Sequence, residues 1–143
     1  QNHQISVKLS AKMDKTAQAV ERLQEENFRL KGQVGQLVDD MCRKEAERYA
    51  GSGSVLIFMD GMDADSVRKL ADAVTQTCQG CCAVFSGNAD GSYKYAMGEK
   101  DGDLRQFTKE MSAKLNGRGG GKPFFVQGSV QASEKEIRNF FEQ

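Results

Sequence analysis

An apolar repeat of seven residues runs through the first third of the chain. Its apolar positions lie alternately three and four residues apart, which is the spacing of a coiled-coil heptad. The two seam positions are occupied by Val20, Leu23, Asn27, Leu30, Val34, Leu37 and Met41. Because one helix cannot cover such a seam by itself, we expect two chains to dimerise through these residues. Asn27 within the seam would fix the register.

A long helix packed on its own domain is the alternative interpretation of this repeat. Gly32 and Gly35 interrupt it, and each lowers the stability of a helix by up to about 1 kcal/mol. The pattern leaves parallel and antiparallel pairing open.

The composition changes near Tyr49, where charged residues give way to the sequence Gly51-Ser52-Gly53-Ser54. This short glycine–serine segment is typical of a flexible joint. We therefore expect a coiled-coil helix with a remnant of an upstream domain over residues 1–50, and a second domain over residues 51–143. Since the chain begins with Gln1 and not with methionine, we expect a piece of a longer protein.

The second domain alternates strand-like and helix-like patterns. Short apolar runs predict strands, stripes of period 3.6 predict helices, and Asn88-Ala89-Asp90-Gly91 predicts a hairpin turn. The expected strands cover residues 54–59, 81–85, 93–97 and 124–130, and helices are expected over about 63–77, from 101–103 onward and after Ser133. The order βαββαβα predicts an α/β fold, with a small mixed four-stranded sheet covered by helices.

A basic glycine run stands out in this domain. Gly119, Gly120 and Gly121 lie between Arg118 and Lys122, and Arg105, Lys109 and Lys114 precede them with a single acid, Glu110. Successive amides in a glycine turn can form an anion-binding nest, and arginine can hold a phosphate through two hydrogen bonds. A purely structural turn is the alternative. We expect an ordered turn with outward-pointing amides, extended by Arg105 and Lys109.

Metal and catalytic chemistry have little support in the sequence. Cys78 and Cys81 have the spacing of a redox or zinc site, but they stand at the end of a helix and the start of a strand, and the one histidine is His3. Buried filler is the better interpretation of these thiols. We expect neither a metal nor a self-sufficient catalytic set in this chain. Four cysteines without a disulfide pattern favour a reducing cytoplasm, and no apolar stretch approaches the roughly 20 residues of a membrane span.

Three motifs resemble the DHH-associated domain. They are Val67-Arg68-Lys69-Leu70-Ala71-Asp72, Tyr95-Ala96-Met97-Gly98, and the run from Gly117 to Pro123 followed by Phe125-Val126-Gln127-Gly128. That domain closes alanyl-tRNA synthetases and long-form alanyl-tRNA editing proteins, and it accompanies DHH phosphoesterases. Val126-Gln127-Gly128-Ser129 and the short tail after it look most like the editing proteins.

This resemblance implies a C-terminal accessory module that binds tRNA, expected to be tRNA(Ala), and dimerises through the long helix. An editing parent would carry a zinc-dependent hydrolase upstream, so zinc would belong to that part and no cofactor to this one. Two other classes stay open: the substrate-binding half of a DHH-type phosphoesterase, and a purely structural dimerisation module. Lys122 stands where the phosphoesterase branch often has histidine, which counts against the first of these.

Overall fold

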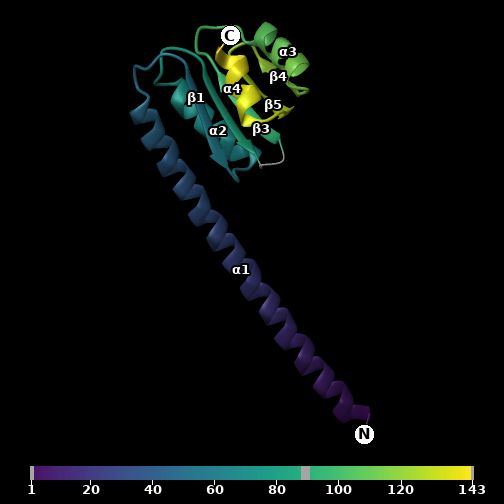
Figure 1. Ribbon diagram of the computed structural model, residues 1–143. Helices are drawn as coiled ribbons and strands as arrows, with labels where there is room; N and C mark the ends of the chain where they lie inside the picture. Colours follow the sequence, from purple (N-terminus) through teal and green to yellow (C-terminus); the bar gives the residue numbers. More distant parts are fainter. Residues whose placement is uncertain (1, 88–90, 143) are drawn as a thin grey trace. The chain divides into compact units, whose positions relative to one another are not determined.

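A long helix and an α/β domain make up the protein (Figure 1). The computed structural model describes residues 2–87 and 91–142, with side chains from Ser10 onward. Helix α1 spans Asn2–Arg48. The elements that follow are β1 (Val55–Asp60), α2 (Ala64–Thr75), β2 (Cys82–Gly87), β3 (Ser92–Gly98), α3 (Arg105–Lys114), β4 (Arg118–Lys122), β5 (Phe125–Gln131) and α4 (Glu134–Glu142).

The sheet has five strands in the order β1-β2-β3-β5-β4. β1 and β2 are parallel and are connected by α2, and every other neighbouring pair of strands is antiparallel. The α/β class, the long first helix and the pairing of β2 with β3 are therefore confirmed. The turn expected at Asn88-Ala89-Asp90 lies outside the described residues.

The prediction of four strands was wrong, because the glycine run is itself a strand. β4 pairs antiparallel with β5 across a two-residue turn, Pro123 and Phe124. Three consecutive glycines have low strand propensity, so the sequence favoured a turn. The ladder of hydrogen bonds from β5 needs no side chains, however, and it holds the glycines in an extended conformation.

Two apolar clusters cover the two faces of the sheet. On one face, α2 packs its Val67, Leu70 and Val74 against Val84 and Ala96 of the sheet. On the other face, α3 and α4 cover a second cluster whose buried members include Phe85, Tyr95, Met97, Met111, Val126, Val130 and Ile137. The sheet therefore has helices on both sides, as period-3.6 stripes on three helices require.

Side-chain caps fix the start of two helices. The Ser66 amide donates to the Asp63 carboxylate at 2.8 Å at the start of α2, and the Glu136 amide donates to Ser133 Oγ at 3.2 Å at the start of α4. The hydrogen bonds from Ser66 lower the pKa of Asp63. Both caps confirm helix starts that the sequence predicts.

Helix α1 crosses from one compact unit into the next, since residues 1–37 form the first unit and residues 38–143 the second. In the second unit, Val38, Met41 and Cys42 pack on the cluster beneath α2. Thr77 Oγ1 also donates to the Ala46 carbonyl at 2.7 Å. The sequence places the domain boundary near residue 50, just after the end of α1. The two compact units instead divide between Leu37 and Val38, within the helix.

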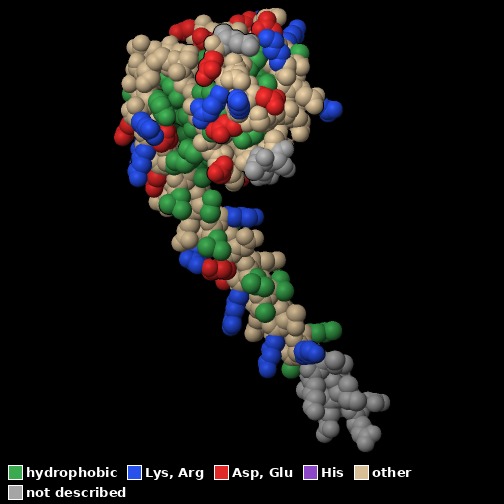
Figure 2. Space-filling model, viewed as in Figure 1, with side chains coloured by type: hydrophobic (Ala, Val, Ile, Leu, Met, Phe, Trp, Pro, Cys, Tyr) green, Lys and Arg blue, Asp and Glu red, His purple; other side chains and the backbone are tan. Residues whose placement is uncertain are grey.

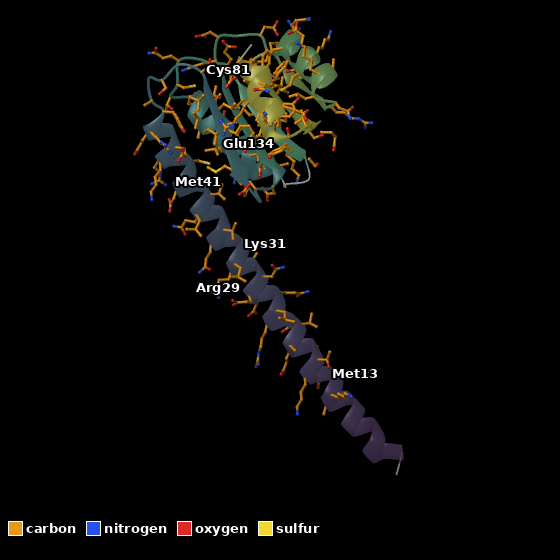
Figure 3. All side chains as sticks on the ribbon, viewed as in Figure 1. Met13, Arg29, Lys31, Met41, Cys81 and Glu134 are labelled. Atoms are coloured by element: carbon orange, nitrogen blue, oxygen red, sulfur yellow. The ribbon has the colours of Figure 1, made fainter. Side chains whose placement is uncertain are left out.

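The heptad seam divides at the same place. Its members up to Leu37 have exposed side chains: Val20, Leu23, Asn27, Leu30, Val34 and Leu37. Met41 is instead half-buried against the cluster beneath α2, which leaves less of its side chain free for a dimer seam. Hydrophobic side chains recur along α1 in Figure 2, and Figure 3 labels Met13 and Met41 on the helix. Among the described residues, no helix is both long and apolar enough to cross a membrane.

Candidate functional site

Strand β4 forms an open edge of the sheet. It pairs with β5 on one side, and all five of its residues are exposed. In an antiparallel pair, every second residue of an edge strand turns its N–H and C=O away from its neighbour. Glycine side chains cannot shield these groups. The edge therefore offers backbone donors to a ligand, although not as the nest of a turn that the sequence suggested.

Gly119 is required by packing beneath the strand. Tyr95 of β3, Gly128 of β5 and Gly119 of β4 occupy one row across the sheet. A Cβ at Gly119 would lie 1.9 Å from the Tyr95 hydroxyl, and one at Gly128 would lie 2.0 Å from the Arg118 carbonyl oxygen. The two glycines thus leave room for the tyrosine and for the close approach of the strands.

The fold requires glycine at position 121 but not at position 120. Gly121 has a φ of +155° and a Cβ there would lie 2.5 Å from the Phe125 carbonyl oxygen, so the fold itself requires glycine. Gly120 has no positive φ, and a Cβ there would meet nothing within 4 Å. The fold therefore gives no reason for glycine at position 120.

A hollow of about 800 Å³ lies between α3 and β4. We call it the α3 hollow. Arg105 and Lys109 enter it from α3, and Arg118 and the three glycines line it from β4. The helix and the strand thus bring together residues that are up to 16 positions apart (105 to 121). Six of the eight predicted binding residues line this one hollow.

Arg105 is already paired within the hollow. Its guanidinium donates to the Asp103 carboxylate at 2.9 and 2.7 Å. These hydrogen bonds lower the pKa of Asp103 to about 2 and raise the pKa of Arg105. Both side chains are exposed, so the pair is worth little to stability. It reduces the positive charge that Arg105 adds to the hollow.

Lys109 and Arg118 supply the unpaired charge of the α3 hollow. Both are exposed, and neither forms an ion pair with any described residue. Two cations beside an open strand edge suit a phosphate: the side chains supply charge and the amides supply directed hydrogen bonds.

The remaining two predicted residues lie elsewhere. The Lys114 ammonium is 5.7 Å from the centre of the Phe140 ring, and Lys114 does not line the α3 hollow. Lys122 lines a second hollow of about 470 Å³, which we call the α2 hollow. Because side chains alternate along a strand, Arg118, Gly120 and Lys122 share one face of β4, with Gln127 of β5 opposite Gly120.

The α2 hollow contains residues that sequence reasoning did not assign to a site. Arg68 of α2, Lys100, Phe124 and Gln127 line it together with Gly120 and Lys122. The sequence did contain a signal for Phe124: it directly follows the only proline. This position indicates a turn, where the side chain is not buried as it would be in a central strand. Arg68 and Gln127 belong to the motifs quoted above, but nothing in their spacing indicates that they meet.

The four cysteines are free thiols, and three of them are buried. Cys42, Cys78 and Cys82 are buried and Cys81 is half-buried, all as free thiols. Burial, together with Glu99 and Cys78, raises the pKa of Cys81 to about 12. Thiols with raised pKa values are poor nucleophiles and poor metal ligands. Within the part of the chain that the structure describes, no three His, Cys, Asp or Glu side chains are grouped to hold a metal ion.

The strand, its glycines and the two hollows all fall within a region that matches a known family. The family model described as DHHA1 domain matches residues 52–143. This chain belongs to the DHHA1 family. The DHHA1 domain therefore includes β1 to α4 and leaves all of α1 outside the match.

Relatives of the DHHA1 domain and its preceding helix include alanine–tRNA ligases. The chain is 24% identical over 139 residues to the enzyme of Psychrobacter sp. (strain PRwf-1), covering 89% of this chain and 15% of the ligase. It is 27% identical over 136 residues to the enzyme of Shewanella loihica, covering 92% of this chain and 15% of the ligase. The chain thus spans less than a sixth of the length of these relatives.

A solved structure shares the fold. The C-Ala domain from Aquifex aeolicus alanyl-tRNA synthetase superposes with a TM-score of 0.54 at 19% identity, covering 65% of this chain and 92% of that one. At this identity the likeness concerns the fold alone. The finding is a distant relationship to the C-terminal region of alanine–tRNA ligases.

Proposed function

We propose that this chain is the tRNA-binding and dimerising C-terminal region of an alanine-tRNA enzyme. One observation carries the proposal: the α3 hollow joins unpaired cations to the open edge of a glycine strand, within a DHHA1 domain whose relatives are alanine–tRNA ligases. The ligand is the phosphate backbone of tRNA(Ala), at a structured corner of the molecule.

Lys109 and Arg118 hold phosphates, and the amides of β4 donate to the same oxygens. Double-stranded RNA is recognised mainly through its phosphates, its 2′-hydroxyls and its shape. An edge of backbone donors suits that surface because it reads no base sequence. Arg105 shares its charge with Asp103, so its contribution is smaller than that of Lys109.

The free part of α1 pairs two chains. Leu23 and Leu37 are 69% and 67% exposed, and Val34 is 57% exposed. Apolar side chains repeated at heptad spacing on a helix favour a coiled coil. The seam of the dimer runs from Val20 to Leu37, since Met41 packs on its own domain.

The parent protein we propose is a long-form editing deacylase of mischarged tRNA(Ala), because Gln127-Gly128-Ser129 and the tail resemble that branch. A zinc-dependent hydrolase would then precede this chain and act in the cytoplasm, with the present residues contributing binding alone. The synthetase itself is the alternative parent. The upstream reading frame distinguishes a hydrolase from an aminoacylation core, and a DHH domain there would instead support the phosphoesterase.

The binding proposal is tested with the full chain and a tRNA(Ala) transcript over a range of salt concentrations. The double variant Lys109→Ala/Arg118→Ala should bind more weakly, and its log–log salt slope should fall by about 0.7–0.9 for each lost phosphate contact. Lys135→Ala, which removes an exposed cation from α4, is the matched control and should change the slope by less. An unchanged slope in the double variant would refute the assignment of phosphates to the α3 hollow.

Dimerisation is tested by sedimentation. The unmodified chain should be a dimer at micromolar concentration, and Leu23→Ala/Leu30→Ala/Leu37→Ala should be a monomer, since each buried Leu→Ala costs about 2–5 kcal/mol. Phe28→Ala removes a large side chain that is 81% exposed and off the seam, and it should leave the dimer intact. A monomeric unmodified chain at high micromolar concentration would overturn this part.

A further inference from the structure

Phe124 differs from every other exposed large apolar side chain of the described residues. The others all lie in α1, whereas Phe124 lies at the tip of the β4–β5 hairpin and is 49% exposed. An aromatic side chain left in water at a hairpin tip contributes little to the core. The position indicates a surface on which another planar group can stack.

The backbone on both sides of this ring is fixed. The Glu99 amide donates to the Phe124 carbonyl at 3.0 Å, and the Leu104 amide donates to the Pro123 carbonyl at 2.7 Å. Pro123 restricts the turn further. The ring is therefore presented from a rigid tip, and a ligand that stacks on it does not have to order the loop first.

Basic side chains line the hollow beside the ring. The Lys122 ammonium lies 5.7 Å from its centre, and Lys100 and Arg68 line the same α2 hollow, where Asp72 is the one acid. Arg68 is paired with Asp65 at 2.9 Å, while Lys100 and Lys122 form no ion pair with any described residue. The hollow thus favours an anion that carries a flat ring.

Two further groups complete the hollow. Gly120 lines the hollow without a side chain, and the space where a Cβ would lie is empty to 4 Å. Gln127 lies opposite Gly120 on the same face and is exposed, so its amide can donate to and accept from the edge of a base.

We propose that the α2 hollow binds one unpaired nucleotide of RNA. The base stacks on Phe124, its phosphate lies against Lys122 and Lys100, and the Gln127 amide meets its edge. This inference rests on the proposed RNA-binding function, and it adds a second contact that a fully paired helix cannot make. Aromatic stacking combined with nearby cations is the usual means of holding single-stranded nucleic acid.

The experiment uses the absence of tryptophan from the chain. Phe124→Trp introduces one fluorophore at the hairpin tip, and Phe28→Trp introduces one at an exposed position of α1 as the matched control. Titration with a tRNA(Ala) transcript and with an oligouridine of eight nucleotides should quench Phe124→Trp and leave Phe28→Trp nearly unchanged. Circular dichroism checks that both variants fold.

Affinity gives the second measurement. Phe124→Leu keeps an apolar side chain but removes the ring, and it should weaken oligouridine binding about 5- to 150-fold. Its salt slope should stay the same, whereas Lys100→Ala/Lys122→Ala should lower the slope by about 0.7 for each contact. A 12-base-pair RNA duplex should bind Phe124→Leu and the unmodified chain equally.

The outcomes separate this inference from the proposed function. If the unmodified chain binds tRNA but Phe124→Leu binds oligouridine normally, or Phe124→Trp is not quenched, the unpaired-nucleotide site is refuted and the α3 hollow stands. Equal quenching at positions 28 and 124 refutes it as well. If the unmodified chain binds no RNA, both the proposed function and this inference fail.

Discussion

Strands β2 and β4 belong to one sheet but have opposite surroundings. Five of the six residues of β2 are buried, and it has β1 on one side and β3 on the other. All five residues of β4 are exposed, and its one neighbour is β5. The stability of the domain therefore resides in the centre of the sheet, and the edge is free to present backbone and charge to a ligand.

The largest loss of stability is expected at the centre of the sheet. Phe85→Ala empties a position in β2 that is fully buried and stacks on Phe58, so it should lower the free energy of unfolding by about 3–5 kcal/mol. Chemical denaturation measures the loss. Arg118→Ala in β4 is the matched control and should change stability by less than about 0.5 kcal/mol. A loss of similar size in both variants would remove the distinction between the strands.

Gly119→Val tests a place where the edge strand β4 packs directly against a core side chain. The new side chain collides with the Tyr95 hydroxyl, and overpacking of this kind costs about 1–3 kcal/mol. The Tyr95 hydroxyl is buried without a hydrogen-bond partner among the described residues, so Tyr95→Phe alone should be nearly neutral. Adding Tyr95→Phe to Gly119→Val should recover part of the loss in thermal denaturation; no recovery would place the collision elsewhere.

Asp63→Ala should affect the centre without affecting the edge. It removes the cap of α2, a helix that packs on β2 and β3, and should cost about 1 kcal/mol at neutral pH. Because hydrogen bonds from Ser66 lower the pKa of Asp63, this contribution is present above the unfolded pKa of about 3.9. It is lost as the pH falls through the folded-state pKa. Denaturation curves at pH 7 and pH 2.5 check the sign, and tRNA affinity at pH 7 should not change.

Much of this architecture was predictable from the sequence. Heptad spacing predicted the long helix, and Val67, Leu70 and Val74 predicted the buried face of α2 because local periodicity determines which face is apolar. The caps at Asp63 and Ser133 join residues three positions apart, so a short stretch of sequence is enough to predict them.

The glycine strand could not be predicted in the same way. Its conformation is determined by β5, and the need for Gly119 comes from Tyr95, which is 24 residues earlier in the chain and one strand beyond β5. The basic residues near the run were found, but their division between the α3 hollow and the α2 hollow depends on how α3 and α2 pack beside β4 and β5. Lys100 and Arg68 join the site only through tertiary structure.

A substitution at Gly120 tests whether the open edge of β4 binds the tRNA backbone, since the fold gives no reason for glycine there. Stability and tRNA(Ala) affinity are measured together for Gly120→Val and the unmodified chain. We predict unchanged or slightly higher stability, because valine favours strands by up to about 1 kcal/mol, and tRNA affinity weakened about tenfold or more, a loss of roughly 1.4 kcal/mol in binding. Unchanged affinity in a folded Gly120→Val chain would contradict RNA binding at the edge of β4, and the glycine strand would then serve the fold alone.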